Sequence, residues 1–431
     1  MQIVVFFSSA NAVATLVGNR LLTQTVNPHV LGELTLLMNL ALWLTLPTAS
    51  GYAYVVRHWR VAREHRAGWG FTFAIGWGLV IQAGIAAIGV VVYWWLGLGV
   101  TFWGSALLLW LICVGQSTNQ AFDSVQAAER RRTTAGLLTL MGNPLRMLAL
   151  ALGGLILVPH TGEELLGVQS GYYLLIAVVT TGLVVQLLRR EEEPRDHGVV
   201  SAQLSVRSFV WYSLPYVFSG IVTQVCASAE RWRLSSLDDP SATAYFVQAV
   251  GLSSSAVAIP CGVLISYYLP VITHTIAKVP APMRATARLR RDFLRFTGGS
   301  LVAVVFVVIV ATDSITPILF GPKYAPVSRL LPWTTAGAAL FQIGQVLAIH
   351  AYIARDTFSP NAAHVVSQMV YAALLILWPV HADPALTFSK IFLGGRLLYV
   401  VFILLTTLWI VARSRRAESL VPLSAESQAK G

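Results

Sequence analysis

Long apolar stretches recur along the chain and are separated by short polar connections. Most are close to twenty residues long, the length that an α-helix needs to cross the hydrocarbon core of a bilayer. Lipid offers no hydrogen-bond partners, so a backbone that crosses it forms helices or a closed barrel, and these stretches are far longer than barrel strands. The pattern therefore predicts an all-α, polytopic membrane protein of about twelve transmembrane helices.

The predicted spans divide equally between the two halves of the chain. The first six are 3–18, 34–56, 71–96, 102–128, 135–158 and 168–188. The last six are 209–229, 242–275, 293–320, 330–354, 362–380 and 388–412. Such a duplication predicts two six-helix lobes, 1–188 and 208–413, around a central cavity. A charged connector, 189–207, joins the lobes, and we expect the polar tail, 414–431, to be disordered in the cytoplasm.

The composition fits a surface that faces lipid. Of the 431 residues, 56% are hydrophobic and only 11% are charged, too few to cover a soluble protein of this size. Cys113, Cys226 and Cys261 lie in apolar stretches without the spacing of metal ligands, so we expect no metal and no cofactor. The first stretch has no preceding Lys or Arg, so it is expected to be a span and not a removable signal.

The basic residues indicate how the chain is oriented. Of the 30 Lys and Arg, 22 lie in the tail and in the loops after even-numbered spans, and six lie on the opposite side. Basic loops stay in the cytoplasm, which places both termini there. This distribution also accounts for the net charge of +11, and the basic loops lack interleaved aromatic residues, so we expect no nucleic-acid partner.

Polar side chains within the spans mark a candidate water-lined path. A stripe at helical spacing occurs on each of three spans: Gln116, Asn119, Gln120 and Asp123; Thr223, Gln224, Ser228, Glu230 and Arg231; Gln342 and Gln345. Hydrogen bonds between helices would explain any single amide, whereas stripes on several spans favour a shared cavity. Asp123 and Glu230 are the candidate residues for a coupling ion.

Arginines inside spans favour an anionic cargo. Arg146 and Arg396 lie within apolar stretches, without an acidic residue one turn away in the same span. A charge at the bilayer centre costs roughly 2.5 to 3.5 kcal/mol, so each requires either a carboxylate on another helix or a cavity. Arg20, Arg57 and Arg231 lie at span ends, where the side chain commonly reaches the interface. A guanidinium group can donate two parallel hydrogen bonds to a phosphate.

Several short motifs carry a resemblance to a known family. They are Asn19-Arg20-Leu21-Leu22, Val30-Leu31-Gly32-Glu33, Glu230-Arg231-Trp232, Ala244-Tyr245-Phe246 and Phe320-Gly321-Pro322-Lys323-Tyr324-Ala325-Pro326. With their positions between spans, they resemble the connectors of Wzx-type polysaccharide flippases, which share a superfamily with MATE exporters and lipid II flippases. Glu230 departs from the aspartate expected there, and no extra pair of C-terminal spans follows, which weakens a lipid II interpretation.

The resemblance implies a cargo and a cellular setting. The cargo would be an undecaprenyl-diphosphate-linked oligosaccharide, moved across the bacterial cytoplasmic membrane for surface polysaccharide synthesis. Its diphosphate would be held by arginines and its sugars by amides, from the set Arg20, Arg57, Arg146, Arg231, Arg396, Gln116, Asn119, Gln120, Gln342 and Gln345. Membrane lipids, and the polymerase and glycosyltransferases of the pathway, would be partners.

Two other functions fit parts of the pattern. A MATE-like exporter of cationic drugs would place carboxylates in the cavity, but the acids within spans, Asp123, Glu230 and Asp313, all lie near span ends. A membrane polymerase or glycosyltransferase would need acidic or His groups on a sizeable outer loop, and the predicted outer loops are short. We therefore expect a transporter and not an enzyme.

Overall fold

The computed structural model describes residues 2–39, 41, 107–116, 118–119, 132–189, 206–237, 240–276, 285–353, 358–380 and 383–419. Nearly all of them are helical, and none of them lies in a β-strand. The predicted span 71–96 falls outside these residues, as do parts of 34–56 and 102–128, most of the connector and the end of the tail. The prediction of an all-α, polytopic membrane protein is confirmed.

The N-terminal helices follow the apolar stretches of the sequence. They are α1 (Gln2–Thr25), a helix from 28 to 39, the helix Leu107–Gln116, α5 (Arg132–Leu157), α6 (Gly162–Arg189) and α7 (Val206–Leu237). Asn27 separates the first two, and its Oδ1 accepts a hydrogen bond from the His29 amide at 3.1 Å. An Asn in this position satisfies an amide that has no partner inside the helix, which fixes where the second helix begins.

The C-terminal helices extend past several of the predicted spans. They are α8 (Pro240–Ile276), α10 (Ala287–Phe320), α11 (Val327–Ile353), α12 (Phe358–Leu377) and α13 (Pro384–Ser419). A 3-10 turn, η1 (Pro322–Tyr324), lies between α10 and α11. Among the described residues, four helical segments are long and apolar enough to cross a membrane: Pro240–Ile265, α10, α12 and Pro384–Arg413. The extra turns of α10 and α13 add basic ends to the apolar stretches.

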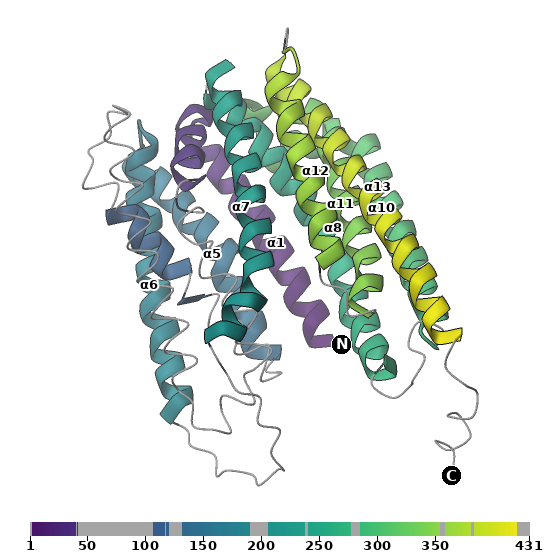
Figure 1. Cartoon of the computed structure of the whole chain (residues 1–431). Helices are drawn as coiled ribbons and strands as arrows, with labels where there is room; N and C mark the ends of the chain where they lie inside the picture. Colours follow the sequence, from purple (N-terminus) through teal and green to yellow (C-terminus); the bar gives the residue numbers. More distant parts are fainter. Residues whose placement is uncertain are drawn as a thin grey trace. The chain divides into compact units, whose positions relative to one another are not determined.

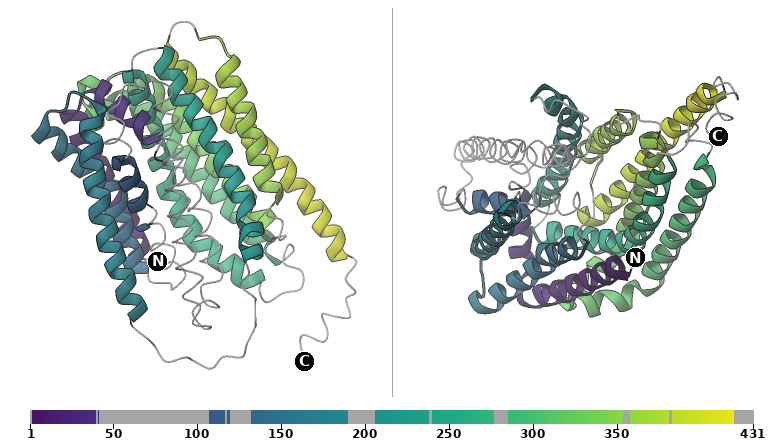
Figure 2. Two further views of the ribbon diagram at one scale, coloured as in Figure 1. Left: turned by 60° about the vertical axis from the view of Figure 1, so that its left-hand side comes forward. Right: turned by 90° about the horizontal axis from the view of Figure 1, so that it is seen from below.

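The contacts divide the chain into two compact units. The first comprises Gln2–Val247 and Thr316–Ala325, and the second comprises Gln248–Ile315 and Pro326–Gly431. In the first unit α5 packs along both α1 and α6 (Figure 1). In the second unit α13 packs along α11 and α12, as the views of Figure 2 also show. The lobe boundaries expected from the sequence stay a prediction.

Glycines allow close helix contacts in both units. A Cβ on Gly154 of α5 would lie 2.6 Å from Val26 Cγ2, just beyond the end of α1. In the second unit, a Cβ on Gly344 of α11 would overlap the Tyr399 ring of α13. Membrane helices gain little from the hydrophobic effect on associating, so small residues that permit close packing hold them together.

Candidate functional site

Arg20 binds the C-terminal end of α10. It lies in the last turns of α1, and its Nη1 donates a hydrogen bond to the Pro317 carbonyl of α10 at 2.8 Å. The same carbonyl accepts the Gly321 amide at 3.1 Å, and the helix dipole favours a cation at this end of the helix. Gly321 follows with a φ of 79°, and a Cβ on it would lie 2.8 Å from the same Arg20 nitrogen. Both the backbone conformation and the nearby Arg20 side chain therefore require a glycine at position 321.

Tyr324 packs beside the same turn. It is fully buried, its ring meets the Tyr245 ring of α8 edge-on at 5.8 Å, and the Phe320 ring lies 6.4 Å away. Burial raises the pKa of the Tyr324 hydroxyl above its ordinary value, and Tyr245 adds to the rise. Three of the sequence motifs thus meet in one place, which we call the motif junction and define by Arg20, Tyr245, Phe320, Gly321 and Tyr324.

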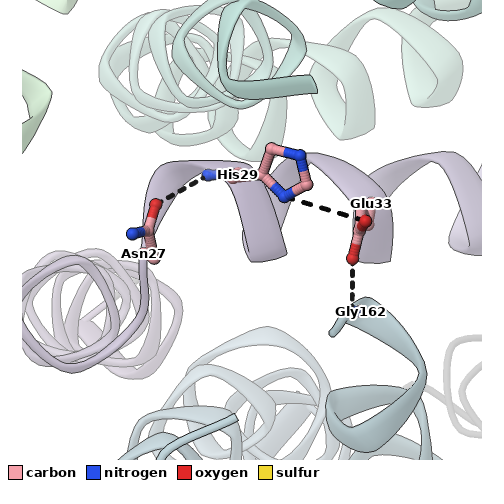
Figure 3. Close-up of polar contacts among 4 residues, drawn as sticks. All are labelled: Asn27, His29, Glu33 and Gly162. Carbon is pink, nitrogen blue, oxygen red and sulfur yellow. Dashed lines mark hydrogen bonds and ion pairs between the residues drawn. The ribbon is translucent and has the colours of Figure 1, made fainter. Parts of the chain in front are cut away.

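Glu33 joins two helices of the first unit. Its Oε2 accepts a hydrogen bond from the Gly162 amide at the start of α6, at 2.8 Å, and its Oε1 lies 3.7 Å from His29 Nδ1 (Figure 3). A carboxylate at a helix N-terminus satisfies a free amide and interacts favourably with the helix dipole. Beside it, a Cβ on Gly32 would overlap the Pro240 carbonyl. The Val30-Leu31-Gly32-Glu33 motif therefore contacts the starts of α6 and α8.

Arg231 belongs to a hydrogen-bond network centred on Asn39. The Asn39 Oδ1 accepts from Gln224 Nε2 at 2.8 Å and from Arg231 Nη1 at 3.0 Å, and Asn39 Nδ2 donates to Ser228 Oγ at 2.9 Å. Asn39 is fully buried. Three positions of the predicted stripe on α7 therefore bond to one asparagine of a neighbouring helix. This is the interhelical bonding that the sequence left open as an alternative to a cavity.

Polar residues on three helical segments of the first unit form a different group, linked by contacts or by helical spacing. We call it the polar cluster: Gln116, Asn119, Arg146, Gln169, Tyr172 and Tyr173. The Gln116 amide donates to the Tyr173 hydroxyl at 3.1 Å, and the rings of Tyr172 and Tyr173 are 5.7 Å apart. Arg146 on α5 lies close enough to Tyr172 on α6 to interact with it electrostatically. Asn119 lies one turn from Gln116, and Gln169 lies one turn from Tyr173.

Several buried atoms of the polar cluster lack hydrogen-bond partners among the described residues. They are Asn119 Oδ1, Arg146 Nε and Gln169 Nε2. A buried polar group without a hydrogen bond costs roughly 1 to 3 kcal/mol, so such groups usually mark an ordered water, an ion, a ligand or strain. Within the described part of the chain, Arg146 and Gln169 each have a free donor atom, and Asn119 has a free acceptor atom.

Arg396 in the second unit lies among aromatic rings. Its guanidinium carbon is 4.6 Å from the centre of the Phe341 ring and 4.8 Å from that of Phe392. The His364 ring interacts with it electrostatically and meets the Tyr399 ring edge-on at 5.3 Å. Aromatic faces attract a cation, and the attraction grows when the cation has lost water. We call these five residues, with Gln345, the aromatic cluster; the Gln345 amide donates to the Tyr399 hydroxyl at 3.1 Å.

Most of the predicted site residues lie in one of these four groups. Arg20 lies in the motif junction, and Arg231 lies in the Asn39 network, next to Glu230 on α7. The polar cluster and the aromatic cluster hold five more: Gln116, Asn119 and Arg146 in the first, and Gln345 and Arg396 in the second. The structure therefore brings predicted residues together in separate places, each within one unit.

Four predicted residues are not placed in these groups. Gln342 is half-buried on α11. Arg57, Gln120 and Asp123 lie outside the described residues. The roles of all the predicted residues in binding cargo or a coupling ion stay predictions.

The sequence analysis missed several members of these groups, among them Asn39, Gln169 and Tyr399. Asn39 and Gln169 have no amide or charged side chain three or four residues away, so a search for polar stripes passes over them. Tyr399 follows Arg396 by three residues, a helical spacing that could have linked the two, but a tyrosine among apolar residues resembles ordinary packing. The available signal was that a lone amide within an apolar stretch needs a partner on another helix.

Comparison with solved structures defines the fold more closely. No protein-family model and no curated protein matches the sequence. The lipid II flippase MurJ in an inward closed conformation superposes with a TM-score of 0.64 at 12% identity, over 96% of this chain and 91% of that one. A MATE transporter in its bent conformation gives a TM-score of 0.62 at 11% identity, over 97% and 95% of the two chains.

A third similar structure comes from Pyrococcus furiosus. It is a MOP superfamily transporter, described as having a binding pocket of reverse polarity that suggests a different function. Its TM-score is 0.62 at 12% identity, over 96% of this chain and 94% of that one. At such identities the likeness establishes the fold alone. The chain therefore has the polytopic, all-helical fold of these three solved structures.

Proposed function

We propose that the protein is a flippase for lipid-linked oligosaccharides, which moves undecaprenyl-diphosphate-linked units from the cytoplasmic to the outer leaflet. The observation that carries the proposal lies inside the apolar helix α5: the buried Nε of Arg146 donates to no acceptor among the described residues. Fixed donors of this kind can replace the hydration that a diphosphate loses in the membrane. The sugars would contact the amides and tyrosines of the polar cluster.

The charge of the in-span residues supports this cargo over a cationic one. Arg146 and Arg396 lie well inside predicted spans, whereas the acids Asp123, Glu230 and Asp313 lie near span ends. The Pyrococcus transporter has been described with a pocket of reverse polarity. Proteins of this fold therefore differ in pocket charge, and the charges of each chain have to be considered individually.

The proposal includes a cellular membrane and an orientation of the chain in it. We place the protein in the bacterial cytoplasmic membrane with both termini in the cytoplasm, because the basic loops follow the even-numbered spans. Two six-helix lobes would open alternately to the two sides, as alternating access in such transporters requires. The glycosyltransferases that make the cargo and the polymerase that uses it would act before and after this step.

The test is to deplete the protein and determine which leaflet accumulates lipid-linked oligosaccharide. Accumulation of the lipid-linked unit on the cytoplasmic side is expected, because synthesis continues while translocation stops. Unpolymerised units on the outer side would instead indicate a polymerase. Normal polysaccharide with increased sensitivity to cationic drugs would indicate an exporter, and either of these outcomes would overturn the proposal.

A further inference from the structure

Helix α10 exposes more of its apolar surface than the other candidate spans of the described chain. Only 11% of its most apolar segment is buried within the protein, compared with 33% in each of the other three. The exposed side chains include Val302 and Phe306, which are 69% and 66% exposed, and further along the helix Ile309 and Val310. These residues recur at intervals of three and four, so they form one stripe along the helix. Such a stripe suits contact with lipid chains.

The same face of α10 continues into a row of arginines. Arg288, Arg291 and Arg295 are exposed, and their spacing of three and four residues places them in line with Val302 and Phe306. Arg290, between them in sequence, is buried, and its Nε donates to Thr286 Oγ1 at 3.1 Å. In the first turns of α10, one arginine is therefore buried within the protein and the other three are exposed on its surface.

We propose that this row of arginines binds the headgroup of an anionic diacyl phospholipid, with its acyl chains along the apolar stripe of α10. Arg291 and Arg295 lie one turn apart, a spacing of about 5–6 Å between Cβ atoms, so both guanidinium groups can reach a single phosphate. An anionic headgroup fits better than a zwitterionic one because it brings no cation of its own to the row. The site is distinct from the polar and aromatic clusters.

One carboxylate lies beside the row of arginines and lowers its positive charge at one end. Asp292 Oδ2 is 3.9 Å from Arg288 Nε, and the Arg288 side chain is 87% exposed. This exposed pair is weak, but it offsets part of the Arg288 charge. Neither Arg291 nor Arg295 forms an ion pair with a described residue. These two arginines therefore carry most of the attraction for a phosphate.

The experiment compares two double variants with equal losses of charge. Arg291→Gln with Arg295→Gln removes the proposed contacts, whereas Lys323→Gln with Arg329→Gln neutralises two exposed basic residues beyond the other end of α10. Native mass spectrometry of the purified protein, with added phosphatidylglycerol or phosphatidylcholine, measures the retained lipid. Each basic residue near an anionic headgroup contributes about 1 kcal/mol, so the first variant should retain phosphatidylglycerol at least about tenfold less strongly.

The control and a charge-preserving variant complete the test. The Lys323 and Arg329 variant should retain phosphatidylglycerol like the original protein, and all proteins should bind phosphatidylcholine equally weakly. Arg291→Lys with Arg295→Lys should keep most of the preference, because the charges remain. Unchanged phosphatidylglycerol retention in the glutamine variant, or an equal loss in the control, would overturn the proposal. Because four other basic residues of the same predicted loop remain in the glutamine variant, it should insert normally.

Discussion

The motif junction and the polar cluster both hold an arginine that the sequence marks, yet the surroundings of the two arginines differ. In the motif junction, Arg20 donates to the Pro317 carbonyl at 2.8 Å and lies against Gly321. In the polar cluster, Arg146 leaves its buried Nε without an acceptor among the described residues. The first arginine stabilises a helix end, and the second has a donor available for a ligand.

Arginines in motifs and isolated arginines have different surroundings in this fold. Arg20 and Arg231 belong to motifs, and both have partners on neighbouring helices, Pro317 and Asn39 respectively. Arg146 belongs to no motif and was singled out only because a lone charge within an apolar span is unfavourable. Motifs at helix ends therefore identify contacts that hold the bundle together, and isolated charges identify candidates for cargo.

Replacing Arg146 should give the largest effect. Arg146→Ala is expected to lower polysaccharide export at least about tenfold without lowering the unfolding temperature, because under our proposal its buried Nε donates to cargo and not to another helix. Export of the labelled polymer and thermal unfolding in detergent measure the two quantities, and Arg329→Ala, in an exposed position, is the control. Normal export, or a clear loss of stability with normal insertion, would show that Arg146 is structural.

A substitution at Gly321 tests whether the contacts of Arg20 stabilise the protein. Gly321→Ala should lower the free energy of unfolding by about 2 kcal/mol, because its positive φ disfavours other residues and the new Cβ displaces Arg20. Gly299→Ala is a matched control in α10, where a Cβ meets no atom within 4 Å, and it should not destabilise the protein. Equal unfolding temperatures for both variants would contradict this role of Arg20 and Gly321.

The Asn39 network should contribute slightly less. Asn39→Ala removes three side-chain hydrogen bonds, and interhelical bonds in membrane proteins average about 0.6 kcal/mol each, so a loss of about 1.5 to 2 kcal/mol is expected. Thr35→Ala on the same helix is the control, since the Thr35 hydroxyl donates to the Leu31 carbonyl of its own helix. A double-mutant cycle with Arg231→Gln measures the coupling, and additive losses would argue against a shared network.

The contact of Glu33 with α6 should have the smallest effect. Glu33→Gln keeps an oxygen for the Gly162 amide but removes the charge that interacts with the helix dipole, so about 0.5 kcal/mol should be lost. Thermal unfolding at low and high salt checks this, because salt screens the charge and should reduce the difference between the two proteins. A difference that is independent of salt would point to packing instead.

The hydropathy pattern alone determined the class of fold. Apolar stretches of about twenty residues are readable without any tertiary contact, because the bilayer imposes both their length and their helical backbone. The same reasoning selected Arg146 and Arg396, since a charge within such a stretch needs a reason to be there. The polar stripes selected Gln116 and Gln345, which the structure places beside Tyr173 and Tyr399.

Which polar residues find hydrogen-bond partners within the protein depends on how the helices pack and cannot be read from the sequence. The stripe on α7 resembles in sequence the stripe that begins at Gln116, yet Gln224, Ser228 and Arg231 all bond to Asn39, which is at least 185 positions away. Helical spacing determines which side chains share a face, but not what that face meets. Whether a buried donor finds an acceptor depends on helix neighbours distant in sequence, and the packing of the helices alone establishes those neighbours.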